Sequence, residues 1–236
     1  MRRLLASLRW DIVRQIRYQL YTVSVLVVAV WGIALSLLPD KAWARPGLIV
    51  PALVAYNLLV TAFYFMTAQV LMEKSEGVLS ALVATPLRAG EYLLSKALSL
   101  SLLALAESLV IALILFGAPR RWGLLLGATL LLGVVYTLLG FIAIAKYDSI
   151  NEFLMPSVLI VVVLTLPLLP HFGLTGRLLF YFHPIEPGLV LLRGAYAPLS
   201  VWELAYGVLA LAAWVALSYR WARRRFEAFV TRAAGN

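Results

Sequence analysis

The sequence at residues 73–96 is EKSEGVLSALVATPLRAGEYLLSK, a charged stretch between two long apolar runs. It contains three acids and three bases, and the pair Thr85-Pro86 interrupts it near its middle. The apolar run before it, residues 48–72, has no charged residue, and the run after it, residues 97–117, has only Glu107. About 20 apolar residues at 1.5 Å per residue cross the hydrocarbon layer. The pattern therefore predicts two membrane-spanning helices joined by a polar connection.

The composition of the whole chain agrees with a membrane protein. Of its 236 residues, 63% are hydrophobic and 13% are charged, whereas a soluble domain has about 25% charged residues and less than half apolar ones. We predict an all-α polytopic membrane protein with one transmembrane domain over residues 1–236. The net charge of +9 fits contact with membrane lipids and their anionic headgroups, and we expect no nucleic-acid partner. The absence of cysteine excludes disulfides and thiolate metal sites.

Six segments have the length and apolar character of spans. They are approximately residues 20–38, 48–72, 97–117, 123–145, 153–170 and 201–220. Ahead of them, residues 2–20 place Leu5, Ile12 and Ile16 on one stripe, with arginines on much of the remainder. This pattern predicts an amphipathic helix in the membrane interface, although a simple basic flank is the alternative.

Residues 171–200, between the fifth and sixth spans, have an apolar middle that is too short and too often broken by proline to cross. Broken backbone at membrane depth is tolerated where protein covers it. We predict a re-entrant pair of short helices on the outer side, divided near His183-Pro184.

The basic residues predict the orientation of the chain. Fourteen of the twenty lie in residues 2–17, in residues 73–96, at Lys146 or in the tail after residue 219, and six lie in the other connections. Lys and Arg are enriched on the cytoplasmic side. We therefore expect a multi-pass protein of the inner or plasma membrane with both termini in the cytoplasm.

Motifs of common enzymes are missing from the sequence. It contains no G-x-x-x-x-G-K-[ST], H-E-x-x-H or G-x-S-x-G, the patterns typical of phosphate-binding loops, zinc proteases and serine hydrolases. We expect no cofactor or metal on this chain, and a transport subunit rather than an enzyme.

Glu107 is the one ionisable residue deep within a predicted span. Such residues are costly and mark functional sites by default, so Glu107 is a candidate for a transport pathway or gate. A hydrogen bond to a neighbouring helix is the structural alternative. Asn57 and Thr61, in the second span, fit interhelical contacts, and Asn57 is kept as a pathway candidate. A secondary carrier or channel that uses Glu107 is the alternative function.

Several ordered motifs resemble the permease subunits of ABC-2 type transporters, which export drugs, lipids and polysaccharides. They are Glu76-Gly77, Leu79 and Leu82, Thr85-Pro86, Glu91 and Lys96, followed by His183-Pro184 and Arg193. The chain has Val78 where that family usually has Thr, and His183 where it usually has Asn. Within the family, the chain is most similar to permeases for export of fluoroquinolones or other drugs.

This resemblance implies a division of labour between subunits. Two permease subunits, here a homodimer rather than a heterodimer, would form a pathway for a hydrophobic or amphipathic drug or lipid. ABC ATPase subunits would bind ATP and Mg, and residues 73–96 would contain the coupling helix that contacts them. The implied coupling residues are Glu73, Glu76, Gly77, Leu79, Leu82, Thr85, Pro86, Arg88 and Glu91. The implied candidates for the pathway or gate are Glu107, Asn57, His183, Pro184 and Arg193.

Overall fold

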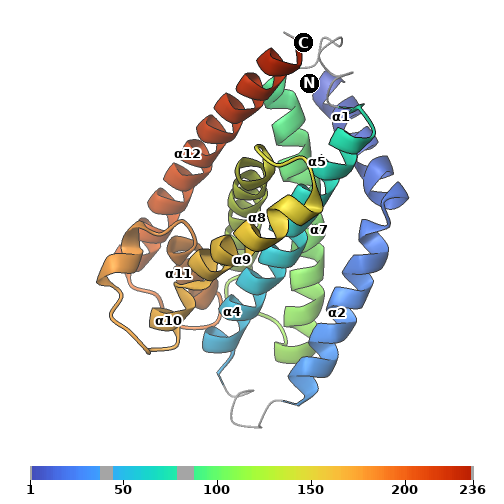
Figure 1. The fold of residues 1–236 in the computed structure, drawn as a ribbon. Coiled ribbons are helices and arrows are strands. Elements are labelled where there is room, and N and C mark those ends of the chain that lie inside the picture. Colours follow the sequence, from blue (N-terminus) through green and yellow to red (C-terminus); the bar gives the residue numbers. More distant parts are fainter. Residues whose placement is uncertain (1, 38–44, 79–87, 235–236) are drawn as a thin grey trace.

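The computed structural model describes residues 2–37, 45–78 and 88–234, and every regular element in these ranges is helical (Figure 1). The α-helices are α1 (Arg2–Arg17), α2 (Leu20–Ser36), α4 (Pro46–Leu58), α5 (Phe65–Ser75), α7 (Ala89–Phe116), α8 (Trp122–Ile144), α9 (Ile150–Thr165), α10 (Leu168–His171), α11 (Glu186–Gly194) and α12 (Val201–Ala234). A π-helix, η1 (Leu59–Tyr64), joins α4 to α5, and a 3-10 helix, η2 (Leu178–Phe182), precedes α11. The predicted all-α class is confirmed.

Five helical segments are long and apolar enough to cross a membrane. They are Pro46–Ser75, Ala89–Ile114, Trp122–Ile144, Ile150–His171 and Val201–Ala228. A sixth candidate consists of Leu5–Arg17 and Leu20–Ser36 taken together, two helices that meet at a bend of 66°. These segments match the predicted spans in order, so the chain is a multi-pass membrane protein.

The bend between α1 and α2 is made at Gln19. This residue has φ of 56° and ψ of 24°, and it is the one non-glycine residue with positive φ in the described parts of the chain. Left-handed backbone is uncommon for residues other than glycine. The turn ends α1 and lets that helix pack against α7 instead of continuing along α2.

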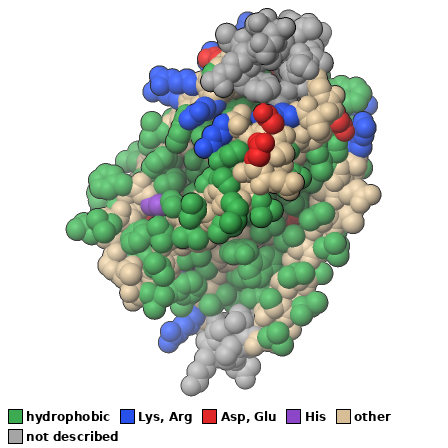
Figure 2. Space-filling model, viewed as in Figure 1, with side chains coloured by type: hydrophobic (Ala, Val, Ile, Leu, Met, Phe, Trp, Pro, Cys, Tyr) green, Lys and Arg blue, Asp and Glu red, His purple; other side chains and the backbone are tan. Residues whose placement is uncertain are grey.

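Helix α8 forms the centre of the bundle and packs against α7, α12, η1, α11 and α5. Its buried side chains include Leu132 and Leu138, which join Leu58, Phe63 and Leu100 in the main apolar core. The outer helices are far less covered, since 28% of the Ile150–His171 span and 17% of the Val201–Ala228 span are buried. Figure 2 shows hydrophobic side chains over the middle of the molecule and charged ones toward its two ends.

The polar connection after the second span is shorter than predicted. Helix α5 continues to Ser75, and α7 begins at Ala89, eight residues before the predicted start of the third span. The backbone N–H of Arg88 donates to Glu91 Oε2 at 3.0 Å, which caps the first turn of α7. Leu79, Leu82, Thr85 and Pro86 lie outside the described residues.

The segment between α9 and α12 consists of short helices, and η2 and α11 are separated at His183-Pro184 as predicted. The backbone N–H of Ile185 donates to His183 Nδ1 at 3.2 Å, and His183 Nε2 lies 3.1 Å from the Val163 carbonyl oxygen. Burial lowers the pKa of His183 to about 4. The imidazole is therefore neutral at neutral pH and bridges α9 to the start of α11.

The contact between α8 and the π-helix depends on Gly140. A Cβ atom at this position would lie 2.6 Å from the Phe63 carbonyl oxygen and 3.2 Å from Phe63 Cα, both backbone atoms that cannot swing aside.

We predict that Gly140→Ala destabilises the protein by about 1–3 kcal/mol, the usual cost of overpacking. The check is thermal unfolding in detergent. Gly127→Ala, on the same helix with nothing within 4 Å of the added atom, is the matched control, and equal melting temperatures for the two variants would contradict the tight contact.

Candidate functional site

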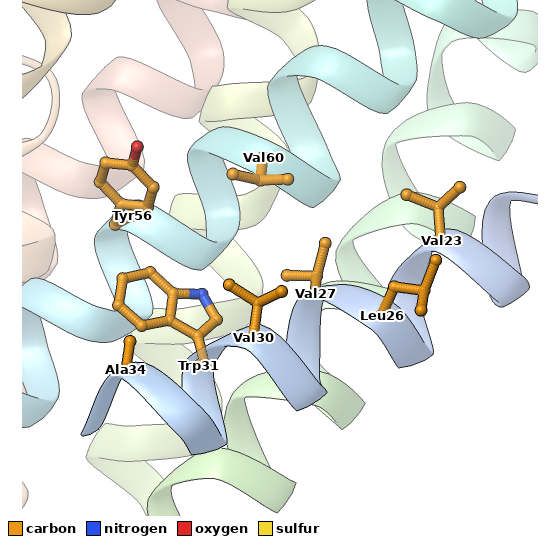
Figure 3. A pocket seen from close by; sticks show the side chains of 8 residues that line it. All are labelled: Val23, Leu26, Val27, Val30, Trp31, Ala34, Tyr56 and Val60. Atoms are coloured by element: carbon orange, nitrogen blue, oxygen red, sulfur yellow. The ribbon is translucent and has the colours of Figure 1, made fainter. Parts of the chain in front are cut away.

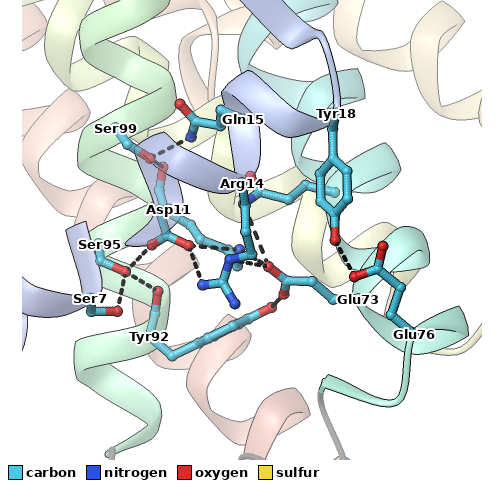
Figure 4. Close-up of polar contacts among 12 residues, drawn as sticks. Ser7, Asp11, Arg14, Gln15, Tyr18, Glu73, Glu76, Tyr92, Ser95 and Ser99 are labelled. Atoms are coloured by element: carbon cyan, nitrogen blue, oxygen red, sulfur yellow. Dashed lines mark hydrogen bonds and ion pairs between the residues drawn. The ribbon is translucent and has the colours of Figure 1, made fainter. Parts of the chain in front are cut away.

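Four charged side chains from three helices meet near the ends of α5 and α7 that flank the predicted coupling segment (Figure 4). Asp11 and Arg14 come from α1, Glu73 from α5 and Lys96 from α7, and we name this group the charged quartet. Lys96 Nζ lies 2.6 Å from Glu73 Oε1 and 3.1 Å from Asp11 Oδ1. Arg14 Nη2 lies 2.8 Å from Asp11 Oδ1, and its Nε lies 3.4 Å from Glu73 Oε1. Two acids and two bases make the quartet formally neutral.

The quartet is buried almost completely. The side chains of Asp11, Glu73 and Lys96 are 0% exposed, and that of Arg14 is 22% exposed. Removal of a charge from water costs several kcal/mol unless close partners and hydrogen bonds compensate. Here each charged group has at least two opposite charges within 4 Å, so the quartet acts as a joint that requires all three helices in register.

Neutral polar groups complete this joint. The Tyr92 hydroxyl donates to Glu73 Oε2 at 2.7 Å, and the Ser95 hydroxyl donates to Asp11 Oδ2. Gln15 Nε2 donates to Ser99 Oγ at 2.8 Å, which adds a second link from α1 to α7. The bonds from Tyr92 and Ser95 satisfy the carboxylate oxygens that the two bases leave open.

An aromatic cluster extends the joint to two more helices. The Tyr92 ring lies 4.8 Å from that of Phe226 on α12 and 6.4 Å from that of Phe141 on α8, measured between centroids. Phe141 and Phe226 also contact each other at 6.0 Å. Through Tyr92, the quartet is therefore in contact with α8 and α12 as well.

The described coupling candidates occupy different environments. Glu73 was predicted within a partner-facing connection, but its side chain is buried because Lys96, Arg14 and Tyr92 surround it. Gly77 has φ of 68° and turns the chain sharply after α5. Arg88 is exposed, and Glu91 is engaged in the cap described above.

Glu76 stands at the beginning of the exposed segment. Its side chain is 37% exposed, and its Oε2 accepts a hydrogen bond of 2.9 Å from the Tyr18 hydroxyl. Burial, together with this bond to Glu76, raises the pKa of Tyr18 to about 12. Tyr18 therefore remains a donor at neutral pH and ties the end of α1 to the end of α5. Arg17 adds a longer contact to Glu76 at 3.7 Å.

One feature of the sequence indicates the quartet, although our prediction did not use it. Asp11 is the only acid in the predicted amphipathic helix over residues 2–20. Ser7, Asp11 and Gln15 recur every four residues and so share one face, and in the structure this face contacts α7 through Ser95 and Ser99.

A second polar cluster lies deeper in the bundle, around Glu107 of α7. Thr61 Oγ1 donates to Glu107 Oε2 at 2.5 Å, and Asn57 Nδ2 donates to the same oxygen at 3.0 Å. Glu107 is 5% exposed and Asn57 is fully buried. The structure thus brings together two of the predicted pathway candidates, Glu107 and Asn57, and adds Thr61 from the π-helix.

The other gate candidates lie elsewhere. Arg193 on α11 forms an ion pair with Glu203 on α12, and His183 bridges α9 and α11 as described above. No hydrogen bond or ion pair links His183 or Arg193 to Glu107 within residues 2–37, 45–78 and 88–234. These described ranges also hold no group of three His, Asp or Glu residues suited to a metal ion.

The quartet makes a sharp prediction about charge balance. Lys96→Met leaves the two buried acids with one base, and we expect a loss of about 3–5 kcal/mol in stability, as when one partner of a buried pair is removed. The double substitution Glu73→Gln with Lys96→Met keeps the Asp11–Arg14 pair, and we expect it to cost less than the sum of the two single changes. Thermal unfolding of the four proteins measures this difference.

The control for this cycle is Arg223→Met. Arg223 is 57% exposed and pairs with Glu227 on the surface of α12, where ion pairs contribute little. A Lys96→Met protein as stable as the Arg223→Met protein, or strictly additive losses in the cycle, would contradict the structural role of the quartet.

Comparison with known proteins places the chain in a family. The model of the fluoroquinolones export permease protein family matches residues 2–234. Two proteins of Mycobacterium tuberculosis, from strains CDC 1551 / Oshkosh and ATCC 25618 / H37Rv, are each 28% identical over 243 residues. Both are named fluoroquinolones export permease protein, and the similarity covers 100% of this chain and 99% of each relative. The chain therefore belongs to the fluoroquinolones export permease protein family and is a membrane permease of an exporter.

Proposed function

We propose that this chain is the transmembrane subunit of an ABC-2 type exporter. A second copy would complete a pathway for a hydrophobic or amphipathic compound, and separate ATPase subunits would hydrolyse ATP with Mg. The family match and the ordered motifs around residues 76–96 support this assignment. The relatives' name makes a fluoroquinolone the first substrate to test.

The charged quartet is the observation that carries the proposal. Residues 76–91 leave the end of α5 and return to α7, and the quartet binds these two helix ends to each other and to α1. A force applied to this segment by a partner would therefore move three helices as a unit. The contact of Tyr92 with Phe226 and Phe141 would pass the movement to α12 and α8. A rigid joint of this kind is what an ATPase needs in order to move the spans.

The arrangement of the ends supports a cytoplasmic position for this joint. The start of α1, the end of α12, the end of α5 and the start of α7 all lie at one end of the bundle, the top in Figure 1. The exposed surface of α1 includes Leu5, Trp10 and Ile16, at 62%, 64% and 61% exposure. An interfacial position would place these side chains among the lipids, while Asp11 remains against α7. The segment of α10, η2 and α11 would then form the outer re-entrant gate.

Coupling predicts a strong effect of charge reversal at the exposed segment. We expect Arg88→Glu to lower ATP-driven export by about ten-fold or more, because reversed charges at an interface cost several kcal/mol through repulsion. The measurement is fluoroquinolone export from cells that co-express the cognate ATPase subunit, together with ATPase activity of the purified complex. Arg88 is exposed, so folding of the chain should be unaffected.

Arg121→Glu is the matched control, since Arg121 is also exposed but lies at the opposite end of the bundle, before α8. We expect normal export from this variant. Export that continues without any ATPase subunit, driven by an ion gradient and abolished by Glu107→Gln, would sink the proposal and favour a secondary carrier.

The orientation can be tested directly, because the natural chain contains no cysteine. Single cysteines at Gly176, between α10 and η2, and at Ala228, near the end of α12, are both at exposed positions. We expect a membrane-impermeant maleimide to label Gly176→Cys in intact cells and Ala228→Cys only after permeabilisation. The reverse pattern would place the quartet on the outer side and exclude a cytoplasmic ATPase as its partner.

A further inference from the structure

An apolar groove of about 420 Å³ lies between α2 and the neighbouring helix formed by α4 and η1 (Figure 3). Helix α2 contributes Val27, Val30 and Trp31 to its walls, and the second helix contributes Tyr56 and Val60. The Trp31 and Tyr56 rings meet edge to face with their centroids 5.4 Å apart. Pockets of about 300–1,000 Å³ with apolar, aromatic walls and a few polar groups are typical of sites for small organic ligands.

The Glu107 cluster adjoins this groove, because the same two helices supply residues to both. Asn57 follows Tyr56 and Thr61 follows Val60 in the sequence, and both side chains turn inward to donate to Glu107. On α2, Ser24 lies close enough to interact with the same carboxylate. The groove therefore has an apolar outer wall and a polar group directly behind it.

Two acceptor atoms of the cluster lack a well-formed hydrogen bond within the described ranges. Glu107 Oε1 and Asn57 Oδ1 are buried and have no hydrogen-bond partner among the described residues. No Lys or Arg side chain in the described ranges pairs with Glu107. An amide oxygen and a carboxylate oxygen can only accept, and a lone carboxylate within a span is costly. The missing group is therefore a donor, and a positively charged donor would also neutralise the carboxylate.

The backbone at this point is irregular as well. The π-helix Leu59–Tyr64 interrupts the second span, and Thr61 belongs to it. Single π-turns within α-helices are rare and occur frequently at functional sites. Three independent features, the groove, the unsatisfied acceptors and the π-helix, thus meet at one level of the bundle.

We propose that the groove and the Glu107 cluster bind a lipophilic aromatic compound that carries a protonated amine. The rings lie between Val27, Trp31 and Tyr56, and the ammonium group donates to Glu107 Oε1 and Asn57 Oδ1. The aromatic faces add a cation–π contribution. This inference rests on the proposed function and extends it, because it names the class of compound and its binding site. Binding itself requires no ATPase, and only the transport step depends on ATP hydrolysis.

The test uses two fluorescent probes of one shape. Dansylcadaverine has an apolar aromatic body and an ammonium group, and N-pentyl dansylamide is the same molecule without the amine. Binding is measured by dansyl emission with the purified full chain in phosphatidylcholine nanodiscs, against empty nanodiscs. We expect the unaltered chain to bind the ammonium probe about ten-fold more tightly, as expected for one charge-assisted contact. This comparison requires no variant.

Two substitutions locate the site. Glu107→Gln keeps the size of the side chain, and we expect it to remove the preference for the ammonium probe while leaving the neutral probe within about two-fold. Val27→Trp fills the groove and should weaken both probes about ten-fold or more. Val208→Trp, at a 47% exposed position on α12, is the control and should leave both affinities within about two-fold.

Equal affinity of the unaltered chain for the two probes would overturn the inference, as would a Glu107→Gln protein that keeps the preference. An equal loss in Val27→Trp and Val208→Trp would also overturn it, since it would indicate partition into lipid. The binding assay contains no ATPase, so its failure is distinct from failure of the proposed function. Probe binding without ATP-driven export would leave the inference standing and reject only the ATPase coupling.

Discussion

The neutrality of the charged quartet is the constraint on which one end of the bundle depends, the end where α1 begins and α12 ends. Three of its four side chains are fully buried, and each charge is compensated only by charges on other helices or on the next turn. Desolvation makes each isolated charge unfavourable by several kcal/mol. Separation of α5 or α7 from the other helices leaves a charge unpaired in a medium of low dielectric constant, and separation of α1 divides the quartet into two isolated pairs, Asp11–Arg14 and Glu73–Lys96. The three helix ends are therefore linked much more rigidly than apolar packing alone would require.

Helix α7 carries both polar clusters, and they differ in kind. Lys96 and Glu107 are eleven residues apart, which corresponds to about 16 Å along the helix at 1.5 Å per residue. At Lys96 the charges balance within the protein. At Glu107 a carboxylate has hydrogen-bond donors on one oxygen, but the other oxygen has no partner in the described part of the chain. A cluster whose charges and hydrogen bonds are paired within the protein has a structural role. A cluster whose acceptor atoms lack hydrogen-bond donors is suited to binding a ligand.

The sequence predicted the spans well, because the length of an apolar run is a local property fixed by the thickness of the membrane. It also predicted the break at His183-Pro184, where a proline determines the backbone. The quartet was not predictable in the same way. It depends on how three helices align with one another, which is not a local property of the sequence. In the sequence, Glu73 and Lys96 are simply the charged residues at the two ends of a polar connection, and only the packing of α1 against them shows that they belong to a buried cluster. Asp11, a single acid on a basic amphipathic helix, was the one local clue. It is overlooked when the helix is divided only into an apolar face and a basic face.

The same reasoning explains why the π-helix matters for the second cluster. A regular α-helix through residues 59–64 would set Thr61 and the residues after it at different angles, since the π-turn changes the phase of the helix locally. The π-helix backbone packs closely against Gly140 on α8, where a Cβ atom would lie 2.6 Å from the Phe63 carbonyl oxygen. The distortion is thus supported by a specific packing contact on one side and directs Thr61 to Glu107 on the other. A carboxylate held by an irregular segment, with one oxygen that lacks a donor in the described part of the chain, is difficult to explain by stability alone, because a Gln or Leu at residue 107 would avoid the cost of the charge.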